Sequence, residues 1–222
     1  MMSRTKNAAR NMLFGFINKI IVLLFSFIVR AIIIKTLGSE YLGLNSLFTS
    51  ILQVLNLAEL GFNSAVVYSM YKPIAENDKV TICALMNLYK KIYRIIGIIV
   101  MSVGLLLLPF LSFLIKGSYP PDINIYLLYI IFLINTGLTY FLFAYKSALL
   151  MAHQKSYAIS IAQSVSCLLQ GIVQIFILIK LKNYYLFVIV QLLATILNNM
   201  IIYIFSEKHY SEYKCEVTLV MI

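Results

Sequence analysis

Long apolar segments alternate with short polar connections along almost the whole chain. An α-helix needs about 20 predominantly apolar residues to cross the hydrocarbon core of a bilayer. This criterion predicts six membrane-spanning helices, at about 11–36, 42–71, 92–116, 123–151, 157–180 and 184–206. The pattern therefore predicts an all-α, polytopic membrane protein. A six-helix domain covers residues 1–210, and a short tail covers residues 211–222.

The connections between these spans are short, with one exception at 72–91. That segment begins with Lys72-Pro73, continues with acidic and lysine residues, and ends in an amphipathic lead into the third span. Pro120 and Pro121 interrupt the chain between the third and fourth spans, because proline cannot continue a helix or donate a backbone hydrogen bond. Lys182-Asn183 supplies the turn between the fifth and sixth spans.

The composition supports a membrane protein: 62% of the residues are hydrophobic and 12% are charged. The mean hydropathy is +0.92. A soluble domain has about half apolar and about a quarter charged residues. The net charge of +10 does not indicate nucleic-acid binding, because the basic residues lie at span ends and not in one solvated patch.

The basic residues predict an orientation, since cytoplasmic loops carry an excess of Lys and Arg. One side of the membrane receives Arg4, Lys6, Arg10, Lys72, Lys79, Lys90, Lys91, Arg94, Lys146, Lys155, Lys208 and Lys214. The other side receives Lys35, Lys116, Lys180 and Lys182. The first side is therefore predicted to be cytoplasmic, with both termini on it.

The sequence predicts no catalytic residue, metal site or cofactor. It contains no phosphate-binding loop and no HExxH motif, and its three cysteines form no CxxC pair, which favours buried thiols over a disulfide or metal role. A membrane glycosyltransferase or polymerase would need acids or histidines in a sizeable loop. The longest predicted loop offers only Glu76 and Asp78, flanked by lysines, which is typical of a solvated turn.

Two basic residues lie inside the first predicted span. Lys19 and Arg30 are eleven residues apart, which places them within about 20° of each other around the helix and about 16 Å apart along it. Ser26 lies on the same side. Long basic side chains near span ends often reach to the membrane surface, and this explanation suits Lys19. Arg30 is different, because helical side chains lean toward the N-terminus, here into the membrane. We expect Arg30 to face a hydrated interior.

The second span carries a polar stripe at helical spacing, formed by Gln53, Asn56, Glu59 and Asn63. An ionised carboxylate in lipid is costly, so Glu59 is predicted to be neutral, hydrated or paired. One alternative is an ion pair with Lys19 or Arg30 that only holds two spans together.

Three further spans carry similar stripes. Their candidate residues are Asn135 in the fourth span, Gln163, Gln170 and Gln174 in the fifth, and Gln191 and Asn198 in the sixth. Interhelical hydrogen bonding would explain each stripe separately. Polar stripes on so many spans together predict a shared aqueous cavity.

The segment Arg30-Ala-Ile-Ile-Ile-Lys-Thr-Leu-Gly-Ser-Glu-Tyr-Leu-Gly-Leu44, followed by Leu57-Ala-Glu-Leu-Gly-Phe62, resembles the first two helices of bacterial polysaccharide transporters. These are the Wzx-like flippases of the multidrug/oligosaccharidyl-lipid/polysaccharide superfamily. Segment 149–174 is similar in texture to the connection between the family's fourth and fifth helices. Gly38 and Gly43 suit a tight reversal and a close helix approach.

This resemblance implies one MATE-like lobe of six helices in the bacterial cytoplasmic membrane. Members of the family have two such lobes and flip undecaprenyl-diphosphate-linked oligosaccharide by alternating access. The resemblance makes Arg30 and Lys19 the candidates for binding the diphosphate, and makes Glu59 a candidate counter-ion, proton site or cation site. Membrane lipids and polysaccharide synthesis proteins are the other implied partners.

The chain matches only the N-terminal lobe of that family, so a second copy or a separate second lobe is expected to complete the cavity. The tail after Cys215 is a candidate truncated continuation. Two alternatives stay open: a multidrug or metabolite exporter of the same fold, and a non-transporting truncated remnant. A cationic-drug exporter would prefer acidic cavity residues, whereas the first span offers two basic ones.

Overall fold

The computed structural model describes residues 2–56, 62–115 and 119–213, and these residues form an all-helical bundle without strands. Two long helices begin the chain: α1 (Met2–Thr36) and α2 (Ser39–Asn56). They are followed by α3 (Phe62–Glu76), α4 (Lys79–Leu106), η2 (Leu108–Phe110), α5 (Leu111–Leu114), α6 (Ile125–Phe141), α7 (Ala144–Ala152), α8 (Ser156–Phe176), η3 (Ile177–Leu181), α9 (Tyr184–His209) and η4 (Ser211–Tyr213). The predicted all-α class is confirmed.

Four helical segments are long and apolar enough to cross a membrane: Thr5–Thr36, Lys79–Leu114, Ser156–Leu181 and Tyr184–His209. The bent pair of α6 and α7 adds a fifth if it is counted as one span. The six predicted spans are therefore not confirmed. The second predicted span, 42–71, corresponds to α2 and α3, which have 18 and 15 residues. At 1.5 Å per residue, each is shorter than the hydrocarbon core of about 30 Å.

The fourth predicted span, 123–151, is broken. Phe143 adopts a left-handed conformation with φ 40° between α6 and α7, and the two helices meet at 48°. Left-handed backbone costs about 1–2 kcal/mol for a residue with a Cβ, so surrounding packing must hold the break in place. Ala148, Leu149 and Leu150 of α7 are fully buried and provide this packing.

The expected long connection at 72–91 is helical except for Asn77 and Asp78. The Asp78 carboxylate caps α4 by accepting hydrogen bonds from the Thr81 backbone N–H at 3.1 Å and from its hydroxyl. Ile82, Met86, Tyr89 and Tyr93 recur at helical spacing and are buried. They extend the helix well before the predicted span 92–116.

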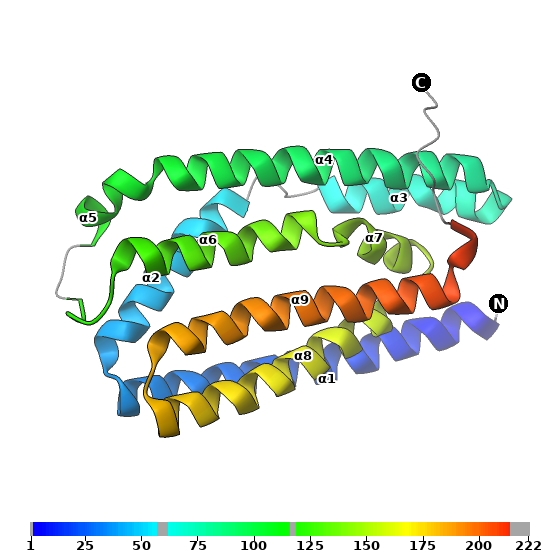
Figure 1. Cartoon of the computed structure of the whole chain (residues 1–222). Helices are drawn as coiled ribbons and strands as arrows, with labels where there is room; N and C mark the ends of the chain where they lie inside the picture. Colours follow the sequence, from blue (N-terminus) through cyan, green and yellow to red (C-terminus); the bar gives the residue numbers. More distant parts are fainter. Residues whose placement is uncertain (1, 57–61, 116–118, 214–222) are drawn as a thin grey trace.

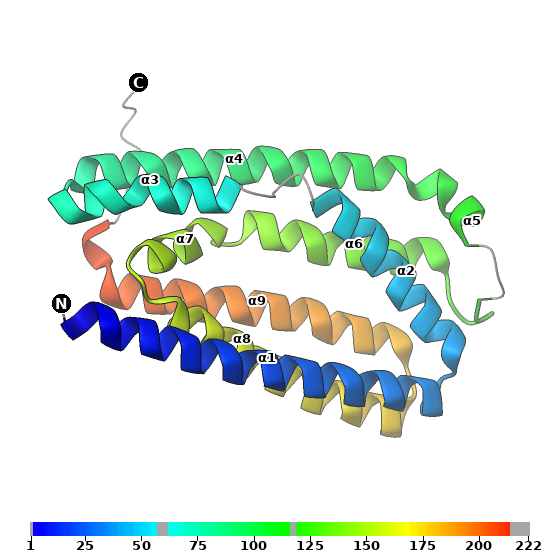
Figure 2. The same cartoon turned by 180° about the vertical axis from the view of Figure 1, so that it is seen from behind.

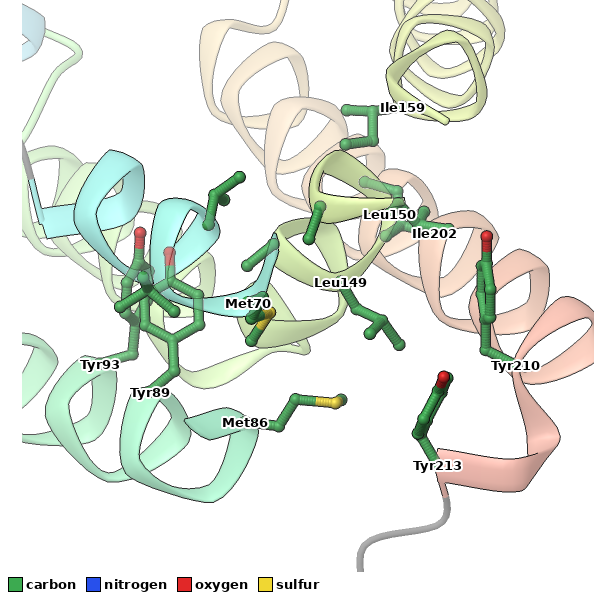
Figure 3. Packing of buried hydrophobic residues seen from close by; sticks show 14 of the residues in the cluster. Met70, Met86, Tyr89, Tyr93, Leu149, Leu150, Ile159, Ile202, Tyr210 and Tyr213 are labelled. Atoms are coloured by element: carbon green, nitrogen blue, oxygen red, sulfur yellow. The ribbon is translucent and has the colours of Figure 1, made fainter. Parts of the chain in front are cut away.

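Two hydrophobic cores hold the helices together. The first joins α3, α4, α7, α8 and α9, and Figure 3 shows Met70, Met86, Tyr89 and Leu149 converging there. The second core joins α1, α2, α6, η3 and α9, and Phe48 lies at its centre against Tyr129 and Phe132. Helix α8 packs against α1 and α9, and α6 packs against α9 and α4. The helices are therefore layered in the order α1, α8, α9, α6 and α4 (Figures 1 and 2).

The α1–α2 reversal depends on Gly38, whose φ of +114° is readily available only to glycine. This part of the glycine prediction is confirmed. Gly43 differs, because a Cβ at that position would have no neighbour within 4 Å. It therefore mediates no close helix approach within the described part of the chain.

The beginning of α1, the α3–α4 turn and the end of α9 lie at one end of the bundle (Figure 1). The α1–α2 and α8–α9 turns lie at the opposite end. Both views agree on this arrangement (Figure 2). Most of the basic residues that were assigned to the cytoplasmic side thus belong to elements that gather at one end.

Candidate functional site

An open pocket of about 770 Å³ lies along α1 and reaches α8. It is lined by Asn18, Lys19, Val22, Leu23, Ser26, Phe27, Arg30 and Gln163. The pocket contains both basic residues of the first predicted span, together with Ser26, as the helical spacing predicted. It also contains Gln163, which the sequence assigned to a different stripe. We call these residues the cationic pocket.

Lys19 and Arg30 are both exposed on the surface of α1. No residue that lines the cationic pocket is acidic, and neither cation makes an ion pair with any residue that the structure describes. Glu59, the acid expected near them, lies outside the described residues. Two basic groups within the apolar part of α1 are costly to place in hydrocarbon, at about 2.5–3.5 kcal/mol each near a helix centre. This arrangement favours water or an anion beside them.

Asn18 is the buried polar anchor of the cationic pocket. Its amide nitrogen donates to Gln163 Oε1 at 2.9 Å, and its amide oxygen accepts from the Ser164 hydroxyl at 3.0 Å. One helical repeat earlier, Asn11 donates to the Gln154 carbonyl and accepts from the Tyr157 backbone N–H. Neither asparagine was among the residues predicted from the sequence, although their seven-residue spacing on one face of α1 is a visible signal.

The approach of α1 to α8 also depends on Gly171. A Cβ at this position would overlap the ring of Phe25. Small residues allow helix backbones to come close together in membrane proteins. Asn11, Asn18 and Gly171 therefore fix the helix that carries Lys19 and Arg30 against its neighbour.

A second pocket, of about 260 Å³, lies between α2, α6 and α9. It is lined by Thr49, Leu52, Gln53, Asn56, Phe132, Asn135, Thr136, Thr139 and Gln191. The structure thus brings together four of the predicted cavity residues, which come from three different spans. None of the lining residues in the described chain is charged, so we call this the neutral pocket.

The remaining candidates make interhelical or intrahelical contacts. Asn63 accepts from the Tyr89 hydroxyl at 2.9 Å, and buried Gln174 donates to the Phe187 carbonyl at 3.0 Å. Gln170 donates to Gln174 at 3.3 Å. Asn198 is half-buried and lines neither pocket. Within the described part of the chain, the polar stripes thus contribute to two pockets and to several helix contacts.

Lys146 was expected to be a basic residue of the cytoplasmic side. It is buried, and its Nζ lies 2.5 Å from Glu207 Oε1, so its charge is neutralised within the bundle.

Cys83 was expected to be a buried thiol. This expectation is wrong, because Cys83 is disulfide-bonded, whereas Cys167 is a free thiol. Among the residues placed in the structure, no group of three or more His, Cys, Asp or Glu could hold a metal ion.

Comparisons with protein-family models, with curated proteins and with solved structures found no match to this chain.

Proposed function

We propose that this chain is a membrane-embedded transport lobe that moves a lipid-linked oligosaccharide, carried on undecaprenyl diphosphate, across the bacterial cytoplasmic membrane by alternating access. The observation that carries this proposal is the cationic pocket. Two basic side chains without acidic partners among the described residues share one open pocket on an apolar helix. Such a pocket suits an anionic group attached to a lipid.

Arg30 and Lys19 have the chemistry to bind a diphosphate. A guanidinium group offers several N–H donors in a planar fork that matches phosphate oxygens, and an ammonium group acts as a point charge. Ser26 lies between them in the same pocket and adds a hydroxyl. A cationic substrate would be repelled here, so the pocket favours lipid-linked sugar over a cationic drug.

The separation of the two cations suggests an order of binding. Eleven helical residues correspond to about 16 Å along α1, which exceeds the length of a diphosphate group. One diphosphate would therefore contact Lys19 and Arg30 in succession. Lys19 lies nearer the end of the bundle that we propose to be cytoplasmic, so it would bind first and Arg30 would bind next.

The outward face of α1 would need a cover during transport. In the most apolar window of this helix, only 6% of the residues are buried. We propose that a second six-helix lobe, supplied by another copy or another chain, covers this face in a MATE-like arrangement. Transport of a fluorescent lipid-linked oligosaccharide by liposomes that contain only monomers of this chain would contradict this part.

The test of the proposed function combines export and binding. Arg30→Gln and Lys19→Gln are expected to reduce surface polysaccharide while the protein remains at normal levels in the membrane. Lys35→Gln is the matched control, because Lys35 is an exposed cation on α1 that does not line the pocket. Purified protein is expected to bind farnesyl diphosphate in calorimetry, and the double variant Lys19→Gln/Arg30→Gln is expected to lose this binding. Unchanged export and unchanged binding in the double variant would refute the proposal.

A further inference from the structure

The neutral pocket lacks the charge that the cationic pocket has, and its walls offer both hydrogen-bond acceptors and hydrogen-bond donors. Asn135 Oδ1 is buried and accepts no hydrogen bond within the described part of the chain. An unsatisfied buried acceptor is costly, so such a group in a pocket calls for a donor. A phosphate at neutral pH offers acceptors almost exclusively, and it would not satisfy this oxygen.

Two threonines of α6 add further acceptors to the same wall. The Thr136 hydroxyl donates to the Phe132 carbonyl at 3.1 Å, and the Thr139 hydroxyl donates to the Thr136 carbonyl at 2.7 Å. Because each hydroxyl donates its only proton to a carbonyl of its own helix, its oxygen remains as an acceptor for a molecule that occupies the pocket.

Asn56 supplies hydrogen-bond donors. Its Oδ1 accepts from the Tyr140 hydroxyl at 2.7 Å, so this contact engages the acceptor end of the amide and leaves the two amide N–H bonds as donors. Gln53 and Gln191 contribute amides that offer both donors and acceptors. A bare metal cation would use the oxygens but would be repelled by these N–H groups.

We infer that the neutral pocket binds the hydroxyl groups of a sugar ring. A hydroxyl donates and accepts at once, and therefore satisfies both Asn135 Oδ1 and the Asn56 amide. The apolar side chains of Phe132 and Leu52 supply a surface for the C–H face of the ring. This inference rests on the proposed function and deepens it: the cationic pocket takes the diphosphate, and the neutral pocket takes sugar of the attached glycan.

The experiment uses the purified full chain in a detergent without a sugar headgroup. Saturation-transfer difference NMR is recorded with a panel of methyl glycosides, because this method detects weak binding. At least one glycoside is expected to show saturation transfer. Asn135→Leu is expected to weaken its binding about fivefold to tenfold, the effect of one lost hydrogen bond. Asn198→Leu is the matched control, since Asn198 Oδ1 is also buried and unpartnered among the described residues but lines neither pocket.

A second variant keeps the test decisive if Asn135→Leu does not fold. Gln53 is exposed, lines the pocket and makes no hydrogen bond that the structure records, so Gln53→Met is expected to fold and to weaken glycoside binding. The inference is overturned if no glycoside shows transfer, or if the folded pocket variants bind as the parent does. Sodium-dependent thermal stabilisation that is lost in the pocket variants, without glycoside binding, would also overturn it in favour of a cation site.

Farnesyl diphosphate binding distinguishes failure of sugar binding in the neutral pocket from failure of the proposed function. If farnesyl diphosphate binds through Lys19 and Arg30 while no glycoside binds, only the sugar pocket is refuted. If glycosides bind while farnesyl diphosphate does not, the diphosphate role of the cationic pocket is refuted and the sugar pocket stands by itself.

Discussion

Lys146 of α7 and Glu207 of α9 form an ion pair inside the bundle, with Nζ and Oε1 2.5 Å apart and side chains only 5% and 24% exposed. The pair lies just beyond the break at Phe143, so it joins the bent segment α7 to the last long helix. Removing one member of a buried ion pair leaves an uncompensated charge.

We predict that Lys146→Met lowers the free energy of unfolding by about 3 kcal/mol, because Glu207 would lose its partner. The double variant Lys146→Met/Glu207→Leu is expected to recover most of this loss, since an apolar pair needs no compensating charge. Unfolding in mixed micelles with increasing denaturing detergent would measure both. Lys72→Met is the control, because the Lys72–Glu76 pair is exposed and pairs of this kind contribute about 0.5 kcal/mol or less. A double variant as unstable as the single one would contradict this account.

Gly171 gives a second prediction. Gly171→Ala places a methyl group against the ring of Phe25 where α1 meets α8, and the overpacking is expected to cost about 1–3 kcal/mol. Gly43→Ala is the matched control, because that position is open and alanine favours a helix by up to about 1 kcal/mol. Thermal unfolding of the two variants should therefore shift in opposite directions. A shift in the same direction for both would show that Gly171 does not set the helix distance.

The cap that Asp78 forms on α4 leads us to predict that the stability of the fold depends on pH. The hydrogen bonds from the Thr81 hydroxyl and backbone N–H hold the pKa of the Asp78 carboxyl below its ordinary value of 3.8. Because the folded pKa is lowered, the cap stabilises the fold fully above the unfolded pKa, and this stabilisation is lost as the pH falls through the folded pKa. The melting temperatures of the parent and of Asp78→Ala should therefore differ at pH 7 and converge on acidification.

The Asp78 carboxyl can also be followed directly by carbon-13 NMR. In Thr81→Val, which removes the hydroxyl donor, the pKa of Asp78 is expected to move back toward its ordinary value. An unchanged pKa in this variant would exclude the hydroxyl as the main cause of the shift.

The proposed orientation gives a fourth prediction. Lys72 and Lys182 are both exposed and belong to opposite ends of the bundle. In intact cells, a membrane-impermeant maleimide is expected to label Lys182→Cys above the level of the parent chain. Lys72→Cys should be labelled only after the cells are permeabilised. The reverse pattern would place the basic end of the bundle outside.

Local sequence is enough to specify the helical class, because apolar segments of span length satisfy their backbone hydrogen bonds in lipid by forming helices. It also determined that Lys19, Ser26 and Arg30 share one side of α1, since helical periodicity is a local property. The reversal at Gly38 followed from local chemistry in the same way.

How the polar stripes are used depends on tertiary packing. Periodicity places Asn135 and Gln163 on helix faces, but only packing assigns Asn135 to the neutral pocket and Gln163 to the cationic pocket beside Asn18. The break at Phe143 depends in the same way on contacts between distant segments, as does the pairing of Lys146 with Glu207, 61 residues away. Local sequence cannot reveal such contacts, because the energy that stabilises them comes from burial and charge pairing across the bundle.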